Sequence, residues 1–182
     1  MPFTAKLKST GERYNVFQKD PDEVRELRGD IVCPVCDTDM TPVISMFYRP
    51  HFRHINKCLS TFAKHTESYA HLAGKEKAAQ VLSMRIGGKI DFEVPIKEAN
   101  RIADVVLTAE DGAFQIAEVQ LSPITVDELR ARNADYQKAG AMAVYWFLGP
   151  KLQNREIEIA ACEFAGGYCR LYYESGVADE YI

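Results

Sequence analysis

The chain has 182 residues, 47% hydrophobic and 26% charged, which is typical of one sizeable globular domain or a domain with a small appendage. No run of 18 or more apolar residues occurs, so no membrane span is expected. The opening residues 1–14 contain no apolar stretch of the kind found in signal peptides, so the expected location is the cytoplasm.

The formal net charge of −4 is distributed unevenly. Residues 1–75 carry 11 basic and nine acidic side chains, whereas residues 76–182 carry 11 and 17. Residues 49–75 contain five Lys or Arg and only one acid, Glu67. This stretch is the only candidate for a nucleic-acid contact, and the net acidity argues against tight non-specific DNA binding.

The first elements expected are two short strands, residues 2–9 and 13–18, on either side of Thr10-Gly11. Residues 20–30 predict a short helix. Asp20 would cap it, proline occupies its first position, and acids precede arginines along it.

Five cysteines, an odd number, argue against a disulfide framework in a protein expected to be cytoplasmic. Cys33 and Cys36 have the spacing of a zinc knuckle. His51, His54 and Cys58 compete for the remaining positions. In an extended chain the two histidines point to opposite sides, whereas His54 and Cys58 converge if a helix starts there.

The predicted zinc ligands are therefore Cys33, Cys36, His54 and Cys58, with His51 as the substitute. Two alternatives stay open: a redox-active pair of thiols, or a set of polar residues that bind no metal. Two strand-like runs, residues 41–46 and 47–52, follow the pair Cys33 and Cys36 in the sequence.

The next elements form a mixed α/β pattern of a helix, three strands, a second helix and a strand. They cover residues 66–85, 89–96, 101–108, 113–121, 125–139 and 141–148. The second helix opens with a capping box, in which Thr125 is followed three residues later by Glu128. Two further strands are expected within residues 155–174.

The turn between the second and third of these strands has two possible registers. A two-residue turn, Asp111-Gly112, would place Asp104 and Glu118 on different faces. A three-residue turn with Gly112 in the left-handed position pairs Ala109 with Ala113 and places Asp104 directly opposite Glu118. Side chains alternate along a strand, so Gln120 would share that face. We favour the second register, because it gathers the polar groups instead of burying them separately.

Two carboxylates about 5 Å apart repel one another unless a cation lies between them. Their oxygen atoms suit Mg²⁺ or Mn²⁺. The alternative is that protein cations compensate them, with Asp104 paired to Arg101 or another basic side chain and Glu118 paired to a lysine. Glu67, His71 and Lys75 recur every four residues on one helix face, which predicts another metal oxygen from Glu67 and phosphate contacts from the other two. A solvated charged face is the competing interpretation of this stripe.

Six short motifs occur in order between about residues 30 and 148: CPVC, HFRH, ESYAH with Lys75, RIADVVL, AEVQLS, and RNADY followed by VYWFL. Together they resemble the competence protein CoiA-like family. The resemblance implies an N-terminal zinc-binding unit fused to a PD-(D/E)xK nuclease-like fold with a restriction-endonuclease-like αβββαβ core. It divides the chain into N-terminal strands and zinc-binding module (1–62), nuclease-like core (63–150) and C-terminal extension (151–182).

The resemblance also implies roles for individual residues. Asp104 matches the motif aspartate and Glu118 the second acid, while Gln120 occupies the position where lysine is commonest. Glutamine can orient a water molecule but carries no positive charge. Glu67 matches the acidic position of the first helix, and Arg132 and Tyr136 match the Arg-x3-Tyr of the second. His71, Lys75, Arg132 and Tyr136 are the expected substrate contacts.

The sequence thus predicts a DNA nuclease dependent on Mg²⁺ or Mn²⁺, with structural Zn²⁺, that serves DNA processing, uptake or recombination. Its expected partners are DNA and a recombination or helicase protein. A nuclease-like module that binds DNA or a recombination protein without cleavage is the first alternative. A zinc-stabilised protein-interaction domain is the second.

Overall fold

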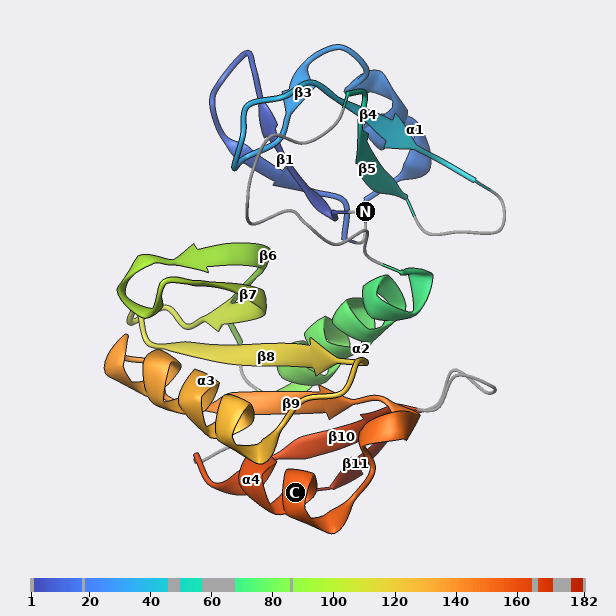
Figure 1. Cartoon of the computed structure of the whole chain (residues 1–182). Helices are drawn as coiled ribbons and strands as arrows, with labels where there is room; N and C mark the ends of the chain where they lie inside the picture. Colours follow the sequence, from blue (N-terminus) through green and yellow to red (C-terminus); the bar gives the residue numbers. More distant parts are fainter. Residues whose placement is uncertain are drawn as a thin grey trace. The chain divides into compact units, whose positions relative to one another are not determined.

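A computed structural model describes residues 2–17, 19–45, 50–56, 68–85, 87–164, 167–171 and 178–181 (Figure 1). The chain divides into two compact units, Met1–Leu72 and Ala73–Ile182. Both contain helices and strands, which confirms the predicted mixed α/β class. Within the described ranges, no helix combines the length and apolar character needed to cross a membrane.

The first unit contains a three-stranded sheet of order β2-β1-β3, a two-stranded sheet β4-β5 and one short helix. The elements are β1 Thr4–Leu7, β2 Arg13–Asn15, α1 Pro21–Glu26, β3 Ile31–Val32, β4 Met40–Val43 and β5 His51–His54. The predicted cap of α1 is confirmed, because the Asp20 side chain accepts the N–H of Asp22. Of the strand run expected at 47–52, His51 and Phe52 lie in β5, and residues 46–49 lie outside the described ranges.

The second unit is built on one six-stranded sheet of order β11-β10-β9-β8-β7-β6. Its elements are α2 Tyr69–Arg85, β6 Lys89–Ile96, β7 Arg101–Thr108, β8 Phe114–Gln120, α3 Val126–Lys138, β9 Val144–Leu148, α4 Arg155–Cys162, β10 Tyr168–Leu171 and β11 Ala178–Tyr181. Strands β6, β7 and β8 are antiparallel, and β8, β9 and β10 are parallel. The predicted capping box of α3, Thr125 with Glu128, is present.

Helices cover both faces of this sheet (Figure 1). On one face, Leu129 and Tyr136 of α3 and Ala160 of α4 pack in a buried cluster with Ile116 and Trp146 of the strands. On the other face, α2 approaches β8 closely, because Gly74 has no side chain to separate the helix from Val119. Alternation along β8 therefore directs Glu118 and Gln120 toward α3, and Val119 toward α2.

The prediction of two strands within residues 155–174 is wrong for the first of them. Residues Arg155–Cys162 form α4, whose N-cap Asn154 accepts the N–H of Ile157. Ile157, Ala160 and Ala161 are buried at helical spacing, so one apolar face packs against the sheet. Only β10 is a strand there, and it pairs with β9, so the C-terminal segment extends the same sheet.

Gly74 provides a test of this packing. A Cβ atom at position 74 would lie 2.6 Å from Cγ1 of Val119. Alanine favours a helix interior by about 1 kcal/mol over glycine, whereas overpacking a core costs about 1–3 kcal/mol. The buried, β-branched Val119 cannot rotate away, so we expect Gly74→Ala to lower the free energy of unfolding by about 1–2 kcal/mol in urea titrations. Gly87→Ala is the control, since nothing lies within 4 Å of its Cβ position; equal stability of both variants would contradict the prediction.

Candidate functional site

The β7–β8 hairpin has the three-residue turn predicted from the sequence. Gly112 has a φ of 85°, and the N–H of Ala109 donates to the carbonyl of Ala113 at 2.8 Å. The strands pair from Thr108 with Phe114 to Val105 with Ala117. These pairs confirm the preferred register, and its continuation by one position would place Asp104 opposite Glu118.

Glu118 is buried, with 4% of its surface exposed, and has two partners on α3. The hydroxyl of Tyr136 donates to its Oε1 at 2.6 Å, and Nη1 of Arg132 lies 3.4 Å from its Oε2. Burial, and then the charge of Asp104, raise the pKa of Glu118 to about 7, although Tyr136 and Arg132 oppose the rise. Arg132 and Tyr136 lie one helical turn apart, which lets both reach the same carboxylate.

Asp104 is anchored through both oxygens of its carboxylate. Its Oδ2 accepts the backbone N–H of Val119 at 2.9 Å, and its Oδ1 lies 3.3 Å from Nζ of Lys75. Arg101, one candidate partner from the sequence, instead binds Asp135. Lys75 and Arg132 therefore compensate the charges of the two acids within the protein. This agrees with the alternative interpretation of the sequence, except that Glu118 pairs with an arginine and not with a lysine.

The helical stripe proposed from the sequence is placed only in part. Lys75 is 2% exposed and lies in the interior, 3.2 Å from Oε1 of Glu93. His71 is half-buried at the start of α2, where its N–H approaches Ser68. Glu67 lies outside the described ranges. Tyr136 is as buried as Lys75, and contacts of these residues with a substrate stay predictions.

Gln120 is 8% exposed and held at both ends of its amide group. Its Nε2 donates to the carbonyl oxygen of Ser122 at 2.8 Å and lies 3.0 Å from Oγ of the same residue. Its Oε1 lies 3.5 Å from Nη1 of Arg132. Glu118 and Gln120 thus share Arg132, which joins the two polar positions of β8.

Glu93 belongs to this cluster and was missed by the sequence analysis. It lies on β6 between Phe92, paired with Val105, and Val94, paired with Ala103, which places it opposite Asp104. The sequence contained a usable signal. Two eight-residue strands joined by the four residues 97–100 already imply this register.

Carboxylate oxygens such as those of Asp104 and Glu118 are of the donor type that Mg²⁺ and Mn²⁺ prefer. Proteins commonly bind Mg²⁺ through one or two carboxylates, and water and substrate phosphate complete its coordination. Repulsion from Asp104 contributes to the raised pKa of Glu118, and a divalent ion held by both acids would relieve that repulsion. Ion pairs with Lys75 and Arg132 compete with such an ion, so its binding must overcome them.

The raised pKa of Glu118 predicts a pH-dependent stability. This carboxyl ionises near pH 4.5 in the unfolded chain but near pH 7 in the folded protein. The folded state therefore retains a proton that the unfolded state has lost, and the free energy of unfolding falls between these pH values, by on the order of 3 kcal/mol. Glu118→Gln does not titrate, so urea unfolding from pH 4 to 8 should show its stability rising by that amount relative to the wild type. A difference independent of pH would contradict the prediction.

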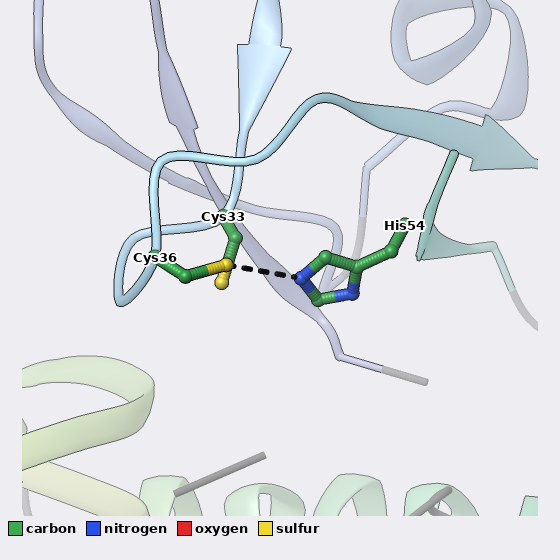
Figure 2. Close-up of side chains that lie close together, drawn as sticks. All are labelled: Cys33, Cys36 and His54. Atoms are coloured by element: carbon green, nitrogen blue, oxygen red, sulfur yellow. Dashed lines mark hydrogen bonds between the residues drawn. The ribbon is translucent and has the colours of Figure 1, made fainter. Parts of the chain in front are cut away.

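Cys33, Cys36 and His54 form a second site, in the first unit, with their side chains pointing toward one another (Figure 2). One ligand atom from each lies within 4.8 Å of the others, and Sγ of Cys36 is 3.6 Å from Nε2 of His54. The knuckle is closed locally, because the N–H of Asp37 donates to the carbonyl of Cys33. The N–H of Val35 also approaches Sγ of Cys33 at 3.4 Å. These residues could hold a metal ion such as Zn²⁺.

The two remaining candidates for zinc ligands are His51 and Cys58. His51 is not part of this group, because it lies three residues from His54 on β5 and the two side chains leave the strand on opposite sides. Cys58 falls outside the described ranges. Burial raises the pKa of the Cys33 thiol to about 11, so metal binding here must displace a proton.

The fold and the site together define a mixed α/β protein in which two acids lie close to one another on the β7–β8 hairpin. The sequence model of the family described as "Competence protein CoiA, nuclease-like domain" matches residues 67–165, more than half of the chain. The chain therefore belongs to the CoiA family. Comparison with curated proteins and with solved structures found no match.

Proposed function

We propose that this protein is a DNA nuclease that hydrolyses phosphodiester bonds with Mg²⁺ or Mn²⁺. The observation that carries the proposal is the register of β7 and β8, which sets Asp104 opposite Glu118 in a domain of a nuclease-like family. The order α2-β6-β7-β8-α3-β9 supports the restriction-endonuclease-like αβββαβ core implied by the sequence.

Asp104 and Glu118 would hold the ion, which polarises a phosphodiester and lowers the pKa of a bound water. The bond from Val119 keeps Asp104 in place, and Tyr136 orients Glu118. Gln120 is anchored by Ser122, so its side-chain oxygen stays turned to the site as a hydrogen-bond acceptor for water. Glu67 is the proposed assisting acid, as in the sequence prediction.

Cleavage assays test this function directly. The zinc-loaded protein is incubated with linear, nicked and single-stranded DNA in Mg²⁺, in Mn²⁺ or in excess EDTA. We expect products from at least one substrate with a divalent ion and none with EDTA. Intact DNA under every condition would overturn the nuclease proposal.

A DNA- or protein-binding module without cleavage is the second candidate. Its supporting observation is that Lys75 and Arg132 already compensate both acids, while Gln120 adds no charge. Calorimetry with Mn²⁺ separates the two functions. Binding that Glu118→Gln abolishes favours the nuclease, whereas no divalent binding in the presence of DNA favours the module.

We also propose that Cys33, Cys36 and His54 bind a structural Zn²⁺, with Cys58 as the fourth ligand. The convergence of three ligand atoms supports this assignment, and Cys58 comes from the sequence prediction. Zinc sites closed by four protein ligands stabilise small folds and leave no position for a substrate.

A further inference from the structure

Lys75 is the only lysine or arginine among the described residues that is fully buried. Removing a charged ammonium group from water is costly, and a buried ion pair often stabilises a fold no better than apolar side chains of the same volume. The position of this lysine therefore calls for an explanation other than stability. Its Nζ lies between Glu93, at 3.2 Å, and Asp104, at 3.3 Å.

Gly74, which precedes Lys75, allows α2 to bring this lysine close to Asp104. Gly74 lets α2 approach β8 so closely that any side chain there would collide with Val119. The N–H of the same Val119 holds Oδ2 of Asp104, and Lys75 holds Oδ1. The close approach of helix and strand thus delivers the ammonium group to the one oxygen of Asp104 that Val119 does not hold.

Glu93 occupies an unusual backbone conformation on the other side of Lys75. Its φ is 54°, although it lies within β6 and is not a glycine. A left-handed residue of this kind costs roughly 1–2 kcal/mol. Such outliers mark sites where a side chain has been directed to a particular place. Here the carboxylate of Glu93 is directed to Lys75, in register with Asp104.

We propose that Lys75 supplies the positive charge that glutamine at position 120 cannot, and that Glu93 positions it beside Asp104. Both are positioning residues: Lys75 orients Asp104 and sets the affinity of the site for a divalent cation. The cluster contains three carboxylates, Glu93, Asp104 and Glu118, against two cations, Lys75 and Arg132. With all three carboxylates ionised the cluster has a net negative charge that attracts a cation, and Lys75 limits how tightly that cation binds. The assignment rests on the proposed nuclease function.

The test measures Mn²⁺ affinity and DNA cleavage in the same variants of the zinc-loaded full chain. The concentration of free Mn²⁺ is measured by its electron paramagnetic resonance signal. Asp104→Asn, which lacks one of the two proposed metal ligands, serves as the variant without a functional site. Lys75→Met removes the competing charge and should tighten Mn²⁺ binding at least about tenfold. The same variant should slow cleavage about a hundredfold, because Asp104 loses its orientation. Glu93→Gln removes a negative charge and leaves Lys75 paired with Asp104 alone, so it should weaken Mn²⁺ binding about fivefold, which is the opposite direction.

Lys77→Met is the matched control. It removes the same charge from the same helix, two residues on, where the side chain faces another direction. We expect it to change Mn²⁺ affinity less than twofold. Equal Mn²⁺ affinity of Lys75→Met and Lys77→Met would overturn the proposal and leave Lys75 a structural ion pair. If circular dichroism shows that Lys75→Met does not fold, Glu93→Gln decides the question, and wild-type affinity in that variant overturns the proposal.

Failure of the two proposals can be told apart. Suppose that Lys75→Met tightens Mn²⁺ binding and Glu93→Gln weakens it, but the wild-type protein cuts no DNA. This result would overturn the nuclease function and keep the role of Lys75 at a cation site. Wild-type cleavage that Lys75→Met leaves unchanged would remove the role of Lys75 and keep the nuclease. Absence of Mn²⁺ binding by both the wild type and Lys75→Met would overturn both.

Discussion

Replacement of Asp104 by asparagine is expected to slow DNA cleavage at least about a thousandfold. Asparagine keeps the size of the side chain and an oxygen that accepts the N–H of Val119. It removes the charge of one of the two proposed metal ligands, and metal ions supply several kcal/mol of transition-state stabilisation. Since 1.36 kcal/mol corresponds to a factor of ten, a loss of about 4 kcal/mol gives this magnitude.

The matched control is Asp91→Asn. Asp91 lies on the neighbouring strand β6, outside the cluster, and pairs with Lys89 at 2.9 Å. Its cleavage rate should stay within about threefold of the wild type, because an ion pair with an exposed lysine and a half-buried aspartate at the surface contributes little. Single-turnover rates in saturating Mg²⁺ measure both variants. Equal rates for Asp104→Asn and the wild type would remove Asp104 from the reaction.

Removal of zinc is expected to unfold the N-terminal module. The first unit has two small sheets and one six-residue helix, so little apolar surface stabilises it without a metal. A structural Zn²⁺ contributes on the order of 10 kcal/mol to such a fold. After treatment with a strong chelator, limited proteolysis should cut within residues 1–62 while residues 89–164 stay protected. Metal analysis of the untreated protein should find one zinc per chain.

Cysteine variants make this test specific. Cys36→Ser should lose zinc, because Sγ of Cys36 is one of the three converging ligand atoms. Cys162→Ser is the control, since that thiol is exposed on α4 of the second unit and should retain full zinc content. Cys58→Ser reports on the fourth ligand. Less than half an equivalent of zinc in the wild type, with no change of proteolysis in chelator, would contradict the zinc assignment.

Several features of the fold could be predicted because they depend on neighbours in the sequence. Gly112 at the third position of a short turn selects a bulged hairpin, and that turn alone determines which residues of β7 and β8 face one another. The capping box at Thr125 likewise begins α3 where the sequence placed it. The error at residues 155–162 has the same local origin, because alternating Glu and Ile resemble a strand until the Asn154 cap is recognised.

The partners of the buried acids depend on distant segments. Glu118 binds side chains of α3, and Asp104 binds Lys75 of α2. The sequence predicted these partners as substrate contacts and did not show that they bind the acids. No pattern in the sequence distinguishes a lysine that turns inward from one on a solvated helix face. The choice depends on how closely α2 approaches β8, and Gly74 determines that distance.

The sequence by itself determined the mixed α/β class and favoured the hairpin register that brings Asp104 and Glu118 together, because turn chemistry and strand alternation are local rules. It also predicted that Cys33 and Cys36 form a knuckle, with His54 among the candidates to join it. Only the tertiary structure decided what surrounds the acids: Tyr136 and Arg132 at Glu118, and Lys75 with Glu93 at Asp104. The physical reason is that a buried charge takes its partners from whichever helices pack against its strand, and that packing depends on the shape of the whole domain.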